Sequence, residues 1–134
     1  MTALTQNRNT PSKAGVDHND PVAAATKIYQ GSIVCLNAAG NAVPAATAIT
    51  LIARGRALAY VDNSAGAAGD LAVPTEAGIF RLTNDGSINR SHIGKAAYIV
   101  DDQTVAATDG TGTRSVAGRI DDVDAAGVWV EIGR

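Results

Sequence analysis

Residues 116–132, VAGRIDDVDAAGVWVEI, form the clearest β-hairpin pattern in the chain. Two apolar runs, Val116–Val123 and Val128–Ile132, flank the turn formers Asp124–Gly127. Alternate side chains of a strand point to opposite faces, so two valines and the isoleucine of the second run share one face. We expect that face to lie in a hydrophobic core.

Similar runs recur upstream of this hairpin. A glycine opens a short apolar run at seven places: residues 31–36, 55–61, 69–73, 78–82, 94–100, 118–123 and 127–132. Glycine tolerates positive φ and so suits the sharp turn that precedes a strand. Short strands with turn residues between them are typical of all-β domains. We predict an all-β protein, a compact small barrel or β-sandwich with little helix, of about eight to ten strands.

Turn and breaker residues predict four local features. Arg54-Gly55-Arg56 interrupts an apolar stretch, as a β-bulge does. The turn formers Asp62–Gly66 predict a loop. Pro74 cannot donate to a strand ladder and is expected at a sheet edge. Ser91–Gly94 is expected to form one helical turn.

The first 22 residues predict an extended N-terminal arm, and residues 23–134 a single β domain. The segment up to Asp20 is polar and buries too little to offset its ordering entropy alone. Asp20-Pro21 suits the start of a short helix, but an extended run agrees better with the β-rich sequence that follows. The arm is either a partner contact, unordered without that partner, or a dispensable tail. Removing residues 2–20 is expected to leave the domain folded.

Composition narrows the class of protein. A net charge of −2 and a pI near 5.5 argue against nucleic acid as the main ligand. The single Cys35 lies in an apolar run and is expected to be a small buried residue. Neither a secretory signal nor a membrane span is recognisable, which predicts synthesis in the cytoplasm and no membrane partner. The hydrophobic fraction of 46% is inflated by alanine, so the core is thin and self-association is expected.

Catalytic and metal-binding patterns are not recognisable. A nucleophilic triad needs a histidine base. His18 lies in the arm, and His92 directly follows Ser91. Side chains of adjacent strand residues point to opposite faces, so Ser91 and His92 would not form a catalytic pair. One cysteine and two distant histidines do not make a zinc site. The aspartate clusters 101–102 and 121–124 lack the spacing of a calcium loop, and residues 109–113 lack the lysine of a phosphate loop. We predict no enzyme and no cofactor.

Partner contacts are expected from the arm and from exposed aromatic residues. Trp129 shares its strand face with Glu131 and so points outward, either to another chain or over a loop of its own subunit. The residues we predict to bind a partner are Leu4, Pro11, Val16, Pro21, Val22, Tyr29 and Trp129.

Four stretches carry a resemblance to a known family. They are residues 23–45 (AAATKIYQGSIVCLNAAGNAVPA), 55–70 (GRALAYVDNSAGAAGD), 77–82 (AGIFRL) and 92–132, in which an IGK motif is followed by an apolar strand, DD, TVAATDG and GRI. Together they resemble the small head proteins of tailed bacteriophages, particularly Mu-like phages and related siphophages and prophages. These are the decoration, or cement, proteins of the capsid.

The resemblance implies a structural virion protein on the outer capsid surface. Such proteins are typically homotrimers at three-fold positions that clamp neighbouring subunits of the major capsid protein. The resemblance brings no catalytic residues. One alternative is a head–tail or tail structural protein. Another, from a different class, is a carbohydrate or host-surface binding module, which would need clusters of exposed tryptophan or tyrosine.

Overall fold

The computed structural model describes residues 2–9 and 17–134. Twelve strands and one 3₁₀ turn form the regular structure of this part of the chain, which confirms the prediction of an all-β protein with little helix. The elements are β1 (Asp17–Pro21), β2 (Thr26–Ile28), β3 (Ile33–Leu36), β4 (Ala42–Pro44), β5 (Ile52–Ala57), β6 (Val61–Asn63), β7 (Ala72–Glu76), β8 (Gly78–Asn84), η1 (Arg90–His92), β9 (Ala96–Ile99), β10 (Thr104–Ala106), β11 (Val116–Asp124) and β12 (Gly127–Ile132). The strand count exceeds the predicted eight to ten because several strands have only three residues.

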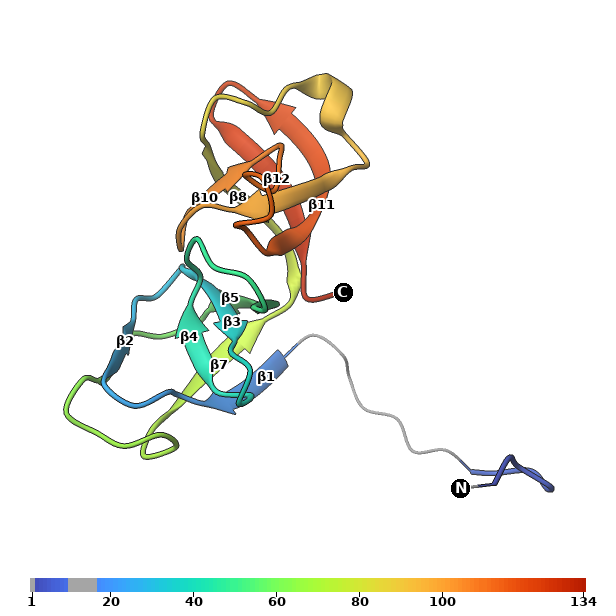
Figure 1. The fold of residues 1–134 in the computed structure, drawn as a ribbon, viewed down its shortest axis with the longest axis vertical. Helices are drawn as coiled ribbons and strands as arrows, with labels where there is room; N and C mark the ends of the chain where they lie inside the picture. The colour runs from blue at the N-terminus through green and yellow to red at the C-terminus, as the bar shows by residue number, and fades with distance from the viewer. Residues whose placement is uncertain (1, 10–16) are drawn as a thin grey trace.

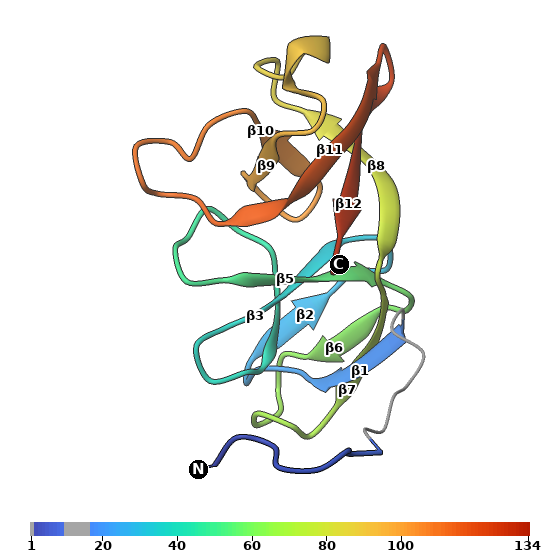
Figure 2. The ribbon, with the colours of Figure 1, turned by 90° about the vertical axis from the view of Figure 1, so that its right-hand side faces the viewer.

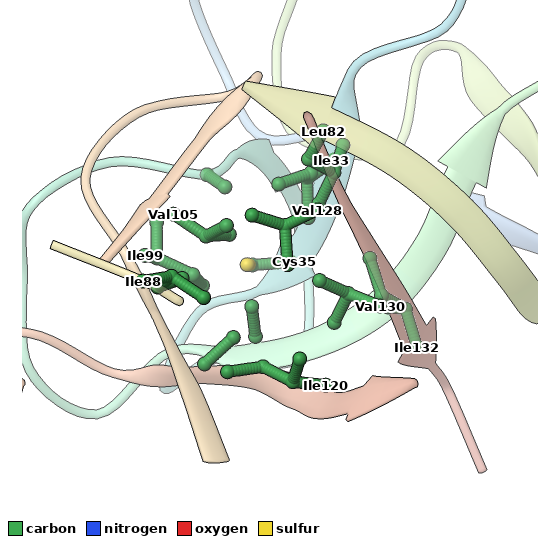
Figure 3. Close-up of a cluster of buried hydrophobic side chains, with 13 residues drawn as sticks. Ile33, Cys35, Leu82, Ile88, Ile99, Val105, Ile120, Val128, Val130 and Ile132 are labelled. Carbon is green, nitrogen blue, oxygen red and sulfur yellow. The ribbon is translucent and has the colours of Figure 1, made fainter. Parts of the chain in front are cut away.

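The C-terminal half closes into a five-stranded barrel with the order β10-β8-β12-β11-β9. β11 and β12 form the predicted hairpin, with an irregular register between Ile120 and Asp122. The inward face of β12 is fully buried, as the alternation predicts, because Val128, Val130 and Ile132 are at most 1% exposed. Figure 3 shows these side chains meeting those of the other barrel strands in one cluster.

The N-terminal half forms a five-stranded sheet with the order β1-β7-β5-β3-β4, and β2 pairs with β6 in a separate ribbon. Figures 1 and 2 show the barrel stacked above this sheet. β3 connects the two parts, because Ile33 and Cys35 enter the barrel cluster while Val34 belongs to a second cluster on the other side. A strand buried on both faces is continuously apolar, which explains the run IVCL. Burial raises the pKa of the Cys35 thiol to about 12, as befits the expected buried residue.

Three of the local predictions are confirmed, fully or in part. Val34 pairs with Gly55 and Cys35 with Ala53, so Arg54 is the extra residue of a bulge. η1 supplies the single helical turn. The predicted loop at residues 62–66 is only partly a loop, because Asp62 and Asn63 belong to β6.

The prediction for Pro74 is wrong. Pro74 lies in the middle of β7, and β7 lies between β1 and β5. Its carbonyl accepts a hydrogen bond of 2.9 Å from Leu58, which follows the end of β5. The backbone nitrogen and carbonyl of one strand residue point to the same side of the strand. The nitrogen of Pro74 therefore points toward Leu58 and away from β1, so its lack of a hydrogen costs no hydrogen bond to β1.

Residues 17–22, assigned above to the arm, belong to the sheet. β1 pairs with β7 over its whole length. Asp20 accepts two hydrogen bonds from the guanidinium of Arg54, at 2.7 and 3.2 Å. This extended conformation agrees with the preference for a strand over a helix at Asp20-Pro21. Removal of residues 2–20 would take away most of this strand and its ion pair. The expectation that the domain stays folded therefore applies only to a deletion that ends before Asp17.

Candidate partner-binding surfaces

The predicted partner-binding residues of the N-terminal region have different surroundings. Leu4 is 72% exposed, in a segment without regular secondary structure. Pro11 and Val16 lie outside the described residues. Pro21 is exposed at the end of β1. Val22 is completely buried in the cluster on the far side of β3, so its assignment as a partner contact is corrected: it is a core residue.

Trp129 lines a groove with two arginines and a second aromatic ring. The groove has a volume of about 480 Å³. Across the β8–β12 ladder Trp129 pairs with Arg81, whose guanidinium carbon lies 5.9 Å from the centre of the indole ring. Arg56 lies over Phe80 at 4.7 Å. We call Arg56, Phe80, Arg81 and Trp129 the arginine–aromatic groove.

The indole of Trp129 also contacts its own hairpin turn. Its Nε1 donates a hydrogen bond of 2.9 Å to Asp124. This bond, with others from the backbone N–H groups of Ala126 and Gly127, holds the pKa of Asp124 below its ordinary value of 3.8. Trp129 points outward as predicted and is half-buried. Trp129 was expected to contact either another chain or a loop of its own subunit, and the structure shows a contact with its own hairpin turn.

This contact predicts a measurable change in the titration of Asp124. In Trp129→Phe the aromatic ring remains but the donor is lost, so the pKa of Asp124 should rise toward 3.8. A lowered folded-state pKa stabilises the protein above the unfolded pKa, and this stabilisation is lost as the pH falls through the folded pKa. The stability difference between wild type and variant should therefore shrink below pH 3.8.

Carboxyl NMR titration of both proteins measures this effect. Asp62 is an internal control, because its pKa is lowered chiefly by Ser64. Its titration should be the same in both proteins. An Asp124 titration that is also unchanged would show that the indole does not set its pKa.

Tyr29 forms a second surface with Tyr60. The two rings lie 5.4 Å apart between centroids, and the tyrosines are 60% and 50% exposed. Tyr29 lines a groove of about 290 Å³ together with Asp102. Partial burial and the neighbouring Asp101 raise the pKa of Asp102. We call Tyr29, Tyr60, Asp101 and Asp102 the tyrosine face.

The tyrosine face adjoins the arginine–aromatic groove. Gly31 and Ser32 line both grooves, so they connect the surfaces that contain Tyr29 and Trp129. The sequence predicted each of these aromatic residues as a partner contact. It did not indicate that positions 100 residues apart would be neighbours in this way.

A third surface has no counterpart in the sequence analysis. Ile49, Ile52 and Val116 are 60%, 66% and 49% exposed and line one groove of about 650 Å³. Arg114 and Arg134 line the same groove. We call these five residues the apolar–arginine groove.

Local hydrogen bonds hold the chain around this groove in place. Thr50 has a φ of +66°, which is unusual for a β-branched residue and bends the chain between Ile49 and Ile52. The hydroxyl of Ser115 donates to the carbonyl of Ala48 at 2.7 Å and accepts from the N–H of Leu51 at 3.1 Å. The chain that carries the exposed isoleucines is therefore attached to Ser115, the residue that precedes β11.

The residues considered for chemistry have structural surroundings. His92 accepts a hydrogen bond of 3.0 Å from the Asn89 N–H at the start of η1, and the Ser91 hydroxyl contacts the Asn89 side chain at 2.5 Å. Within residues 2–9 and 17–134, no three histidine, cysteine, aspartate or glutamate side chains are placed to hold a metal ion. No helix in the same ranges is long and apolar enough to cross a membrane.

Comparison with protein-family models, with curated proteins and with solved structures finds no match.

Proposed function

We propose that the protein is a structural virion protein that decorates and stabilises a bacteriophage capsid, as trimers bridging neighbouring major capsid subunits. The observation that carries this proposal is the exposure of large side chains on two separate surfaces, the tyrosine face and the apolar–arginine groove. Exposed apolar side chains that gather on one surface are typical of interaction sites. The resemblance of residues 23–45, 55–70, 77–82 and 92–132 to capsid decoration proteins supplies the class of partner.

Assembly explains how so small a protein would hold a capsid together. Three copies joined in one rigid unit bind neighbouring shell subunits at once. After the first contact forms, the others become intramolecular, which raises the overall avidity by about 10²–10⁴. Each contact can then be weak.

The N-terminal segment extends the reach of each copy. Residues 1–16 precede β1, and 16 extended residues span up to about 55 Å. β1 itself is fixed in the sheet by its pairing with β7 and by the Asp20–Arg54 ion pair. A partner bound to the preceding segment would therefore be attached to the folded body of the protein.

Phage particles that lack the protein provide the test. On heating they should lose their DNA at a lower temperature than complete particles, and purified full-length protein should restore the resistance. A variant lacking residues 2–16 should fold, shown by an unchanged β-sheet circular dichroism spectrum, but restore the resistance poorly. Particles whose heat resistance is the same with and without the protein would contradict the proposal.

A carbohydrate-binding module is the second candidate, and the Tyr29–Tyr60 pair favours it. Two half-exposed aromatic rings are the kind of platform on which sugar rings stack. Phe80 and Trp129 are less suitable, because Arg56 and Arg81 lie over their rings. Binding on a glycan array that is lost in Tyr29→Ala would establish this function; an array with no binding would exclude it for the glycans displayed.

A further inference from the structure

We propose that the apolar–arginine groove of one protomer receives the tyrosine face of a second copy, so that subunits associate head to tail. This inference rests on the proposed function, in which the protein forms trimers, and assigns the contact between subunits to these two surfaces. Figure 1 shows the C-terminus, whose residue Arg134 lines the groove, on one side of the molecule. The ends of β2 and β10 that adjoin Tyr29 and Gln103 lie on the other side.

The two surfaces complement each other in shape and polarity. The groove is concave and presents three aliphatic side chains, Ile49, Ile52 and Val116. The tyrosine face presents two aromatic rings that stand half-exposed from the surface. Aromatic anchors in apolar pockets are typical of the energetically dominant part of an interface.

The charges of the two surfaces are opposite. Arg114 and Arg134 line the groove, whereas Asp102 lines the tyrosine face, with Asp101 next to it in the chain. Arg54 also lines the groove, but its charge is already compensated by Asp20. A guanidinium beside Asp102 would favour its charged form, which burial and Asp101 disfavour in the isolated chain.

The contact is heterologous because the two surfaces are different. A heterologous contact forms a closed ring when the rotation between subunits closes, as a trimer requires. A heterologous contact also differs from a symmetric contact in how defective variants combine. Two variants, each defective in a different surface, should still bind each other once.

Mixing two such variants tests the inference. Ile52→Asp places a charge in the groove, and Tyr29→Ala removes the aromatic anchor; both positions are more than half exposed, so folding should be retained. Each variant alone should assemble at least about 30-fold more weakly than wild type. Their mixture should form a 1:1 complex of twice the 13.6 kDa subunit mass, measured by light scattering. The control is Leu71→Asp, at a 44% exposed position that lines none of the three grooves, and it should assemble like wild type.

Four results would overturn the inference: a monomeric wild type, normal assembly of either variant, a mixture that stays monomeric, or a control that fails to assemble. If circular dichroism shows that a variant is unfolded, Val116→Asp or Tyr60→Ala replaces it. The proposed function fails separately. A protein that assembles head to tail but leaves particle heat resistance unchanged would contradict the function and support this contact. If the protein stabilises particles but both substitutions leave its assembly unchanged, the function would be supported and this contact contradicted.

Discussion

Gly118→Ala is expected to destabilise the protein by about 3 kcal/mol. A Cβ atom at this position would overlap the carbonyl oxygen of Glu131 and lie 2.9 Å from its carbonyl carbon. It would also lie 3.1 Å from a methyl group of Val130. The obstacle is mostly backbone of β12, the strand hydrogen-bonded to β11, so it cannot move aside without disturbing the β11–β12 register.

Gly94→Ala is the matched control, and urea unfolding measures both variants. Gly94 has a φ of +88° and no atom within 4 Å of an added Cβ, so alanine there meets backbone strain alone. That strain costs about 1–2 kcal/mol. If Gly118→Ala were as stable as Gly94→Ala or more so, the close approach of β11 and β12 would not be essential to the barrel.

Ile120→Ala is expected to cost about 4 kcal/mol, the upper part of the range for truncating a buried isoleucine. The Ile120 side chain is completely buried in the barrel cluster. Most residues of this cluster belong to strands of the closed barrel (Figure 3), so they collapse poorly into the space that its removal leaves. The backbone N–H of Ile120 bonds to Lys95, and the substitution keeps that bond.

Ile79→Ala makes the same chemical change on the outer face of the same barrel. Ile79 is 46% exposed on β8, so the loss should be at most about 1 kcal/mol. Equal midpoints of urea unfolding for the two variants would contradict the position of Ile120 at the centre of the core.

The features that the sequence predicted correctly are those that neighbouring residues determine. The β11–β12 hairpin follows from alternation and from turn residues between the runs. Asn63 shows the limit of such rules. It is a turn former, but its buried amide donates hydrogen bonds of 3.0 Å to the carbonyls of Ala23 and Ala67. The bond to Ala23 spans 40 residues and fixes Asn63 at the end of β6, and no local pattern indicates it.

The candidate surfaces were predicted less completely than the fold. Trp129 was predicted because the alternation of its strand places it outward, and Tyr29 was named as a partner contact with it. Ile49 and Ile52 belong to the apolar stretch that Arg54-Gly55-Arg56 interrupts, and such a stretch predicts a buried strand. Their exposure depends on the positive φ of Thr50 and on Ser115, whose hydroxyl bonds Ala48 across 67 residues. Val22 was assigned to the arm because no local signal shows that it packs in the cluster around Val34.

The most direct test of the account is the solution mass of the purified protein, measured by light scattering, with co-sedimentation on emptied, expanded capsid shells. The purified protein should be an assembly of three 13.6 kDa subunits that pellets with the shells and stays in solution without them. A 13.6 kDa monomer that remains in the supernatant when shells are present would contradict it.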